Sequence, residues 1–176
     1  MISNKKTLNL AGLSYAPGLT LQTAKKMLEA GVKEAERLGV SMVIAIADAG
    51  GNLLAFNRMD DAPLFGIQIA MDKAFTAVFG KMPTLFWKGE YISGELVPLF
   101  FHQRWITFQG GFPLVKGDKI FGGIGVSGGR IEDVYVARSA LKAGGFSIRD
   151  ADDIAKLQKK SRRSRKVIAK ADVLSN

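Results

Sequence analysis

Apolar residues recur every three to four positions between Thr20 and Gly39, the spacing that places them along one side of a helix. Thr20 is a residue type that caps helix N-termini, and Gly39 suits the left-handed position that follows a helix. The next segment has two β-type runs around residues 48–52, whose composition (DAGGN) permits a tight hairpin turn. The pattern therefore predicts an amphipathic helix followed by a β-hairpin.

Helical spacing returns over residues 63–80 and breaks at 81–83, and a shorter helix is expected from Thr84 to about Gly89 or Leu96. After Arg104 come a predicted short strand, a hairpin that turns at 116–119, and a last helix over 130–144.

Hairpins join antiparallel neighbours. The expected fold class is therefore α/β (α+β): a two-layer domain with an antiparallel sheet of about five strands packed with helices on one or both faces. The first strand of the first hairpin, VIAIA, is apolar at every position, which predicts that both of its faces are covered.

Composition narrows the chemistry. The chain has 176 residues, is 47% hydrophobic and has no Cys, so disulfides, thiolate catalysis and thiolate-ligated haem or zinc are excluded. No secretory signal is visible, and the longest clear apolar run, 42–47, is too short to span a bilayer. We therefore expect a cytoplasmic protein without a membrane span.

The net charge of +9 is concentrated near the C-terminus. Eight of the 25 Lys and Arg lie within 156–170, a stretch without acids, and subtracting them leaves +1 for the rest of the chain. We expect one folded domain over 1–146 and a basic tail or helical extension over 147–176. Such a tail either stays solvated or binds nucleic acid or an acidic partner.

Several motifs in fixed order carry a family resemblance. They are LTLQTAKKMLEAG, ADAGGNLLAFNRMDDA, IAMDKAFTA ending in MPT, GGFPLV, and GGIGVSGG followed by EDVYVARSAL. Over Thr20 to Gly144 the chain resembles the GlcG/HbpS family, which includes the C-terminal domain of PduO-type proteins. The resemblance implies a profilin-like fold and self-association into dimers or larger rings. In some members it implies a haem or corrinoid-related ligand, and in others an enzyme acting on hydroxylaminobenzoates.

His102 is the only His, so one chain can offer haem a single imidazole ligand. Arg104 can pair with a propionate. The aromatic residues nearby can wall a flat macrocycle, or they can fill the core or a subunit interface: Phe100, Phe101, Trp105, Phe108 and Phe112.

A second group of candidate ligand residues follows the first hairpin. Arg58 and Asp60 lie where the chain turns into the next helix, and Lys73 and Thr76 are one turn apart on that helix. Arg and Lys can bind a carboxylate, and a buried Lys–Asp pair can do acid/base work. The alternative is an ion pair that locks the strand to the helix.

The glycine-rich segment 122–129 lacks the dinucleotide-binding pattern, so its glycines are interpreted as permitting close backbone approach. Ser127 and Gly128 precede the last helix, whose N-terminal amides can receive an anion. Glu132 and Asp133 are interpreted as partners of that helix dipole.

Three functions remain open. The first is a small-ligand binding protein, with haem as the leading ligand, His102 on the iron, and a role accessory to a catabolic pathway. The second is a cofactor-independent lyase-type enzyme acting on a small aromatic acid such as a hydroxylaminobenzoate. The third is an oligomeric accessory protein recruited through its basic tail.

Overall fold

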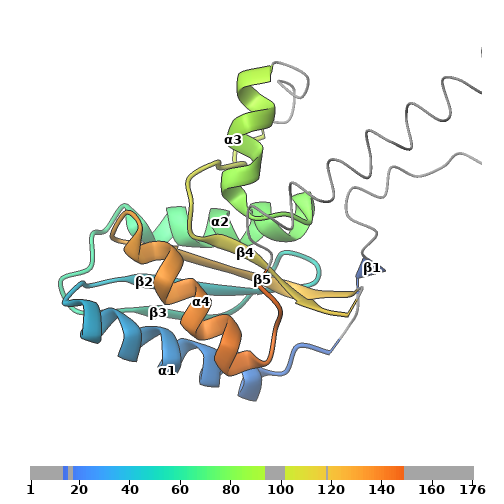
Figure 1. The fold of residues 1–176 in the computed structure, drawn as a ribbon. Coiled ribbons are helices and arrows are strands. Elements are labelled where there is room, and N and C mark those ends of the chain that lie inside the picture. Colours follow the sequence, from blue (N-terminus) through green and yellow to red (C-terminus); the bar gives the residue numbers. More distant parts are fainter. Residues whose placement is uncertain (1–13, 16–17, 94–101, 118, 149–176) are drawn as a thin grey trace, which may run out of the picture.

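A computed structural model describes residues 14–15, 18–93, 102–117 and 119–148 (Figure 1). In chain order the elements are β1 (Ser14–Tyr15), α1 (Leu21–Leu38), β2 (Val43–Asp48), β3 (Leu53–Arg58), α2 (Gly66–Gly80), α3 (Thr84–Ser93), β4 (Gly111–Lys116), β5 (Lys119–Ser127) and α4 (Glu132–Gly144).

β5 is the central strand of one sheet. It pairs antiparallel with β2 on one side and with β4 on the other, and β3 pairs antiparallel with β2. β1, only two residues long, pairs parallel with the start of β5. The antiparallel part of the sheet thus has four strands, rather than the expected five or so.

Helices lie on both faces of this sheet (Figure 1). Ile44 and Ile46 of β2 belong to the large apolar cluster formed with α1 and α4. Val43 and Ala45 point to the opposite face and pack with Ala70 of α2. The apolar run in β2 is therefore buried on both sides, as its sequence predicts, and the molecule has three layers rather than two.

Local signals explain where α1 and the first hairpin begin and end. The Thr20 side chain accepts a hydrogen bond from the Thr23 backbone N–H, and Gly39 ends α1 with φ 68°. In the hairpin turn, Oδ1 of Asp48 accepts hydrogen bonds from the backbone N–H groups of Gly50 and Asn52. The predicted helix and hairpin are confirmed.

The prediction of a short strand directly after Arg104 is wrong. Residues 105–110 form no strand, and β4 begins only at Gly111. The Ile106 N–H donates instead to the hydroxyl of Thr76 on α2. Aromatic and β-branched residues gave this segment strand character, but its backbone pairs with a helix side chain.

The basic stretch 156–170 lies outside the described residues, and so does the rest of the tail from residue 149. The last described residues return to the sheet edge, where the Ser147 N–H donates to the Val115 carbonyl oxygen at 2.8 Å. None of the described helices is both long and apolar enough to cross a membrane.

Candidate functional site

Phe75 of α2 lies at the centre of a group of aromatic and charged side chains. Its ring stacks on that of Phe79 with centroids 4.2 Å apart and on the His102 imidazole at 5.4 Å. The guanidinium carbon of Arg104 lies 4.0 Å from the Phe75 ring centroid. These neighbours bury Phe75, whereas Phe79 is 52% exposed and His102 is also exposed. We call Asp72, Phe75, Phe79, His102 and Arg104 the α2 cluster.

Arg104 joins the loop before β4 to this cluster. Its Nε donates to Oδ1 of Asp72 at 3.1 Å, and Gln68 donates to the same oxygen at 2.9 Å. The Arg104 side chain stays 39% exposed. Because a guanidinium has five N–H donors, this arrangement holds Arg104 in place and leaves donors that can face a ligand.

Thr76, one of the predicted ligand residues, holds the loop that carries His102 and Arg104. Its buried hydroxyl donates to the Arg104 carbonyl oxygen at 3.1 Å and accepts from the Ile106 N–H at 3.0 Å. These two bonds fix residues 104–106 on α2.

Replacing Thr76 with valine is expected to lower the free energy of unfolding by about 1–3 kcal/mol, because two part-buried backbone groups lose their partner. Urea denaturation measures this change in the free energy of unfolding. Thr23→Val is the matched control, since the Thr23 hydroxyl bonds only the exposed Thr20 hydroxyl, and we expect a change within about 0.5 kcal/mol. Equal effects of the two substitutions would mean that other contacts hold the loop.

The His102 ring is oriented by its own loop. Its Nδ1 accepts a hydrogen bond from the Arg104 backbone N–H at 3.2 Å. In a neutral ring the proton then resides on Nε2. The imidazole therefore presents an N–H donor to solvent in this arrangement.

Lys73 is buried and paired on the side of α2 that faces the sheet. Its Nζ donates to Oδ2 of Asp133 at 2.7 Å and to the Val126 carbonyl oxygen at 2.6 Å. Burial lowers the pKa of Lys73 and raises the pKa of Asp133, while their mutual attraction opposes both shifts. The pair ties α2 to the start of α4 across the end of β5.

The amides of residues 129 and 130, just before α4, already have partners within the chain. The Gly129 N–H donates to Oδ1 of Asp133 at 2.9 Å, and the Arg130 N–H donates to Oε2 of Glu132 at 2.9 Å. Both acids lie in the first turn of α4, where they suit the helix dipole. Their carboxylates bind the amides of the preceding loop, whereas Ile131 at the N-cap makes no side-chain capping bond. An anion bound by the amides of residues 129 and 130 would have to displace them.

Ser127 and Gly128 form packed backbone before that helix. Ser127 is 3% exposed, and a Cβ on Gly66 would lie 3.5 Å from its carbonyl oxygen. Gly128 has φ 145°, and a Cβ there would meet the Ser41 carbonyl oxygen at 2.5 Å. Close approach explains Gly128 better than contact with a ligand does.

Arg58 and Asp60 are exposed at the end of β3. Within the described part of the chain neither side chain forms a hydrogen bond or an ion pair. The partner of Lys73 is Asp133, so the structure does not bring the Arg58–Asp60 segment and Lys73 together as one ion-paired site.

The predicted aromatic wall is dispersed. Phe112 is buried in the cluster between the sheet and α1 and α4, and Trp105 packs against Trp87 with centroids 5.1 Å apart. Phe108 is 64% exposed, while Phe100 and Phe101 lie outside the described residues. The aromatic surface beside His102 comes from α2 instead.

Three members of the α2 cluster were missed by sequence reasoning. Asp72, Phe75 and Phe79 recur at three- and four-residue spacing, which predicts the helix but assigns these side chains no role in a site. The exposure of Phe79 was the unpredicted feature. Within the described residues no group of three or more His, Asp or Glu side chains could hold a metal ion.

Comparison with known proteins identifies the family. A family model described as "Haem degrading protein HbpS-like" matches residues 19–142. The chain belongs to this HbpS-like family, and the GlcG/HbpS resemblance is confirmed.

Three similar proteins illustrate the relationship. A 15.0 kDa protein from the dhaT–dhaS intergenic region of Citrobacter freundii is 36% identical over 132 residues, covering 70% of this chain and 89% of that protein. Protein GlcG of Escherichia coli K12 is 35% identical over 109 residues, covering 62% of this chain and 81% of that protein. The crystal structure of a PduOC–heme complex superposes with a TM-score of 0.70 at 29% identity, covering 76% of this chain and 99% of that one.

Proposed function

We propose that this protein binds haem or a related tetrapyrrole at the α2 cluster, with His102 as the iron ligand. The observation that carries the proposal is that an exposed imidazole and a part-exposed guanidinium from the loop before β4 meet an exposed phenylalanine ring of α2. Support also comes from the family description and from the relative crystallised with heme.

The chemistry of these side chains suits the group. Haem supplies an iron that accepts a nitrogen ligand, and His102 is the only imidazole of the chain. Phe79 offers an apolar face, and Arg104 can pair with a propionate carboxylate. Asp72 and Phe75 would keep the guanidinium in place while it does so.

The His102–Arg104 hydrogen bond adds a condition. A neutral imidazole that binds iron through Nε2 carries its proton on Nδ1, and a protonated Nδ1 cannot accept the Arg104 N–H. We therefore propose that haem binding opens this bond and shifts residues 102–104.

The remaining predicted site residues take supporting roles in this proposal. Thr76 positions the loop, and Lys73 holds α2 against the sheet. Ser127 and Gly128 shape the backbone beneath α2. Contact of Arg58 or Asp60 with the ligand stays a prediction.

Titration with hemin tests the proposal. We expect the wild-type chain to bind one equivalent with a sharp Soret shift, and His102→Ala to lose that shift. Arg104→Gln should keep the Soret position but bind roughly tenfold more weakly, the effect of losing a hydrogen bond to a charged group. Absorption spectra follow both.

A truncation after Ile148 is the control for hemin bound by the basic tail, since it keeps the contact of Ser147 with Val115. It should bind like the full chain. Binding that persists in His102→Ala and disappears on truncation would reject the α2 cluster as the site.

Other parts of the proposal concern the setting of this site. We propose a dimer or larger oligomer in the cytoplasm that serves a catabolic pathway, with the basic tail solvated or bound to an acidic partner or nucleic acid. The alternative of a lyase acting on a small aromatic acid gains no support from the similar proteins.

A further inference from the structure

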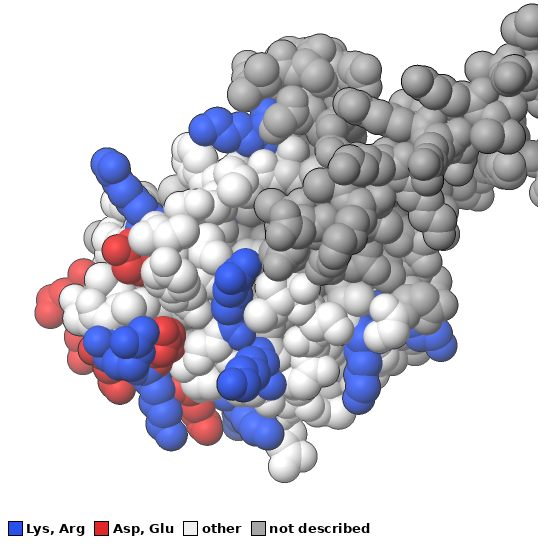
Figure 2. All heavy atoms as spheres, in the orientation of Figure 1, with Lys and Arg blue, Asp and Glu red and all other residues white. Residues whose placement is uncertain are grey.

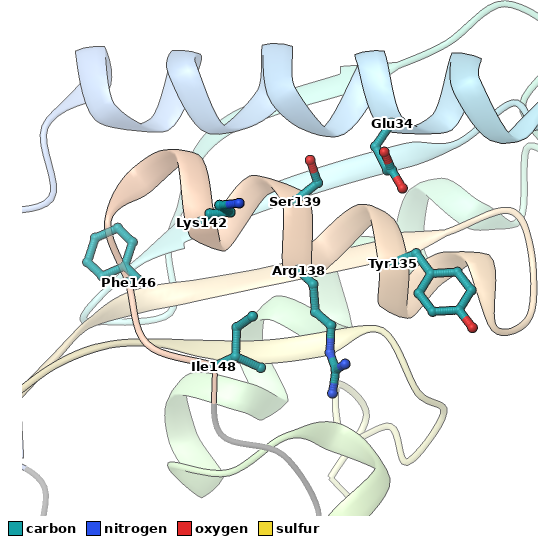
Figure 3. Close-up of a pocket in the computed structure, with 7 residues that line it drawn as sticks. All are labelled: Glu34, Tyr135, Arg138, Ser139, Lys142, Phe146 and Ile148. Carbon is teal, nitrogen blue, oxygen red and sulfur yellow. The ribbon is translucent and has the colours of Figure 1, made fainter.

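A groove of about 530 Å³ runs along α4, on the opposite side of the sheet from α2 (Figure 3). Its volume lies within the range of about 300–1,000 Å³ that is usual for small-molecule sites. The residues on which the argument rests are Glu34, Tyr135, Arg138, Lys142, Phe146 and Ile148. None of them belongs to the α2 cluster.

Arg138 is the unusual member of this lining. Its Nε is buried and has no hydrogen-bond partner within the described part of the chain. Figure 3 shows the side chain leaving α4 on the side away from α1, as Tyr135 does. A buried charged donor without an acceptor costs stability, so a rotation of the Arg138 side chain that turns its guanidinium towards an anion in the groove would relieve that cost.

The charges around Arg138 favour an anion. Lys142 adds a second, exposed positive charge one turn along α4. Glu34, the one acid among the described residues that line the groove, is paired with Arg37 at 2.7 and 2.9 Å, and this contact holds the pKa of Glu34 below its ordinary value. Arg37 therefore balances the negative charge of Glu34. Basic side chains cross the middle of this face, whereas acidic ones gather towards one end (Figure 2).

The rest of the lining is apolar or aromatic. Phe146 is half-buried, with its ring 6.0 Å from that of Phe121, and Ile148 follows it on the same wall. Tyr135 is 46% exposed and adds a ring with a hydroxyl donor. A ligand that fits must therefore combine an apolar body with a negative end.

We infer that this groove binds a small amphiphilic carboxylate, a molecule with a ring or short acyl chain and one acid group. Arg138 anchors the carboxylate, and Lys142 and the Tyr135 hydroxyl assist it. The apolar body rests on Phe146 and Ile148. This site is separate from the α2 cluster and does not depend on haem.

The test uses the full chain with 2-naphthoate as probe and its neutral amide, 2-naphthamide, as the matched ligand. Calorimetry is expected to show saturable binding of naphthoate and at least roughly tenfold weaker binding of the amide, which lacks the charge. Arg138→Gln should weaken naphthoate binding by a similar factor. Lys25→Gln, an exposed lysine of α1 outside the groove, should leave it unchanged.

Amide NMR shifts locate the site and separate it from the haem proposal. On adding naphthoate, shifts should concentrate in residues 135–148, and His102→Ala should bind the probe like wild type. Shifts centred on residues 102–104, or equal binding of naphthoate and its amide, would overturn the inference. If Arg138→Gln is misfolded by circular dichroism, the charge reversal Lys142→Glu replaces it, and unchanged binding there would also overturn it.

Discussion

Replacing Lys73 with methionine is expected to lower the free energy of unfolding by roughly 3–5 kcal/mol, the usual result of leaving one charge of a buried pair alone. Methionine keeps the apolar stem and removes the ammonium that contacts Asp133 and the Val126 carbonyl. Asp133 would then retain only the Gly129 N–H as a partner. Urea denaturation at neutral pH measures the loss.

A control and a double mutant separate charge from packing. Lys33→Met, at an exposed position of α1, is expected to change stability by no more than about 0.5 kcal/mol. Lys73→Met combined with Asp133→Asn should recover about 1–3 kcal/mol relative to the sum of the single effects, because the stranded charge is gone. If Lys73→Met lies within about 1 kcal/mol of wild type, the pair does not hold α2 to α4.

The pH dependence of the stability of Lys73→Met provides a second test of the ion pair. Without Lys73, the pKa of Asp133 rises further above its ordinary value, because burial persists and the opposite charge is lost. An acid whose pKa is raised in the folded state stabilises that state at pH values below its unfolded pKa. This contribution is lost as the pH rises through the folded pKa. The loss of unfolding free energy in Lys73→Met is therefore expected to become smaller as the pH falls towards the ordinary carboxyl pKa of about 3.9. It is expected to be larger at neutral pH.

Elements set by nearby residues were predictable. Thr20 and Gly39 mark the two ends of α1 through contacts within its first and last turns. Asp48 closes the hairpin turn by accepting a hydrogen bond from an amide two residues later. The apolar run of β2 also predicted burial on both faces. Each of these signals lies inside the segment that it shapes.

The candidate site could not be predicted in full, because it depends on contacts between residues that are distant in the sequence. Thr76 bonds a loop some 30 residues later, and Lys73 finds its acid 60 residues away. Nothing in the spacing of Lys73 distinguishes Asp133 from the nearer Asp60. Helical periodicity likewise placed Phe79 on a stripe without showing that this end of the stripe faces solvent.

Glycines in β5 were predicted to permit close backbone approach, and Gly125 shows why this matters for the site. A Cβ at this position would overlap the Ala70 carbonyl oxygen and lie 2.6 Å from the Ala74 nitrogen. Both obstacles are backbone atoms of α2, the helix that carries Phe75 and Thr76. No rotation of a side chain can make room for the added methyl group.

Gly125→Ala is therefore expected to cost roughly 3 kcal/mol of unfolding free energy, the upper end of the usual range for overpacking. Because α2 must move away from β5, the same variant should also bind hemin more weakly than wild type if the α2 cluster is the haem site. Gly50→Ala is the matched control, since its added methyl group would meet only side-chain atoms in an exposed turn, the Asn52 amide nitrogen at 2.9 Å and Oδ1 of Asp48 at 3.3 Å. We expect it to cost under about 1 kcal/mol and to leave hemin binding unchanged. A loss below about 1 kcal/mol for Gly125→Ala would show that α2 packs on β5 less closely than these contacts require.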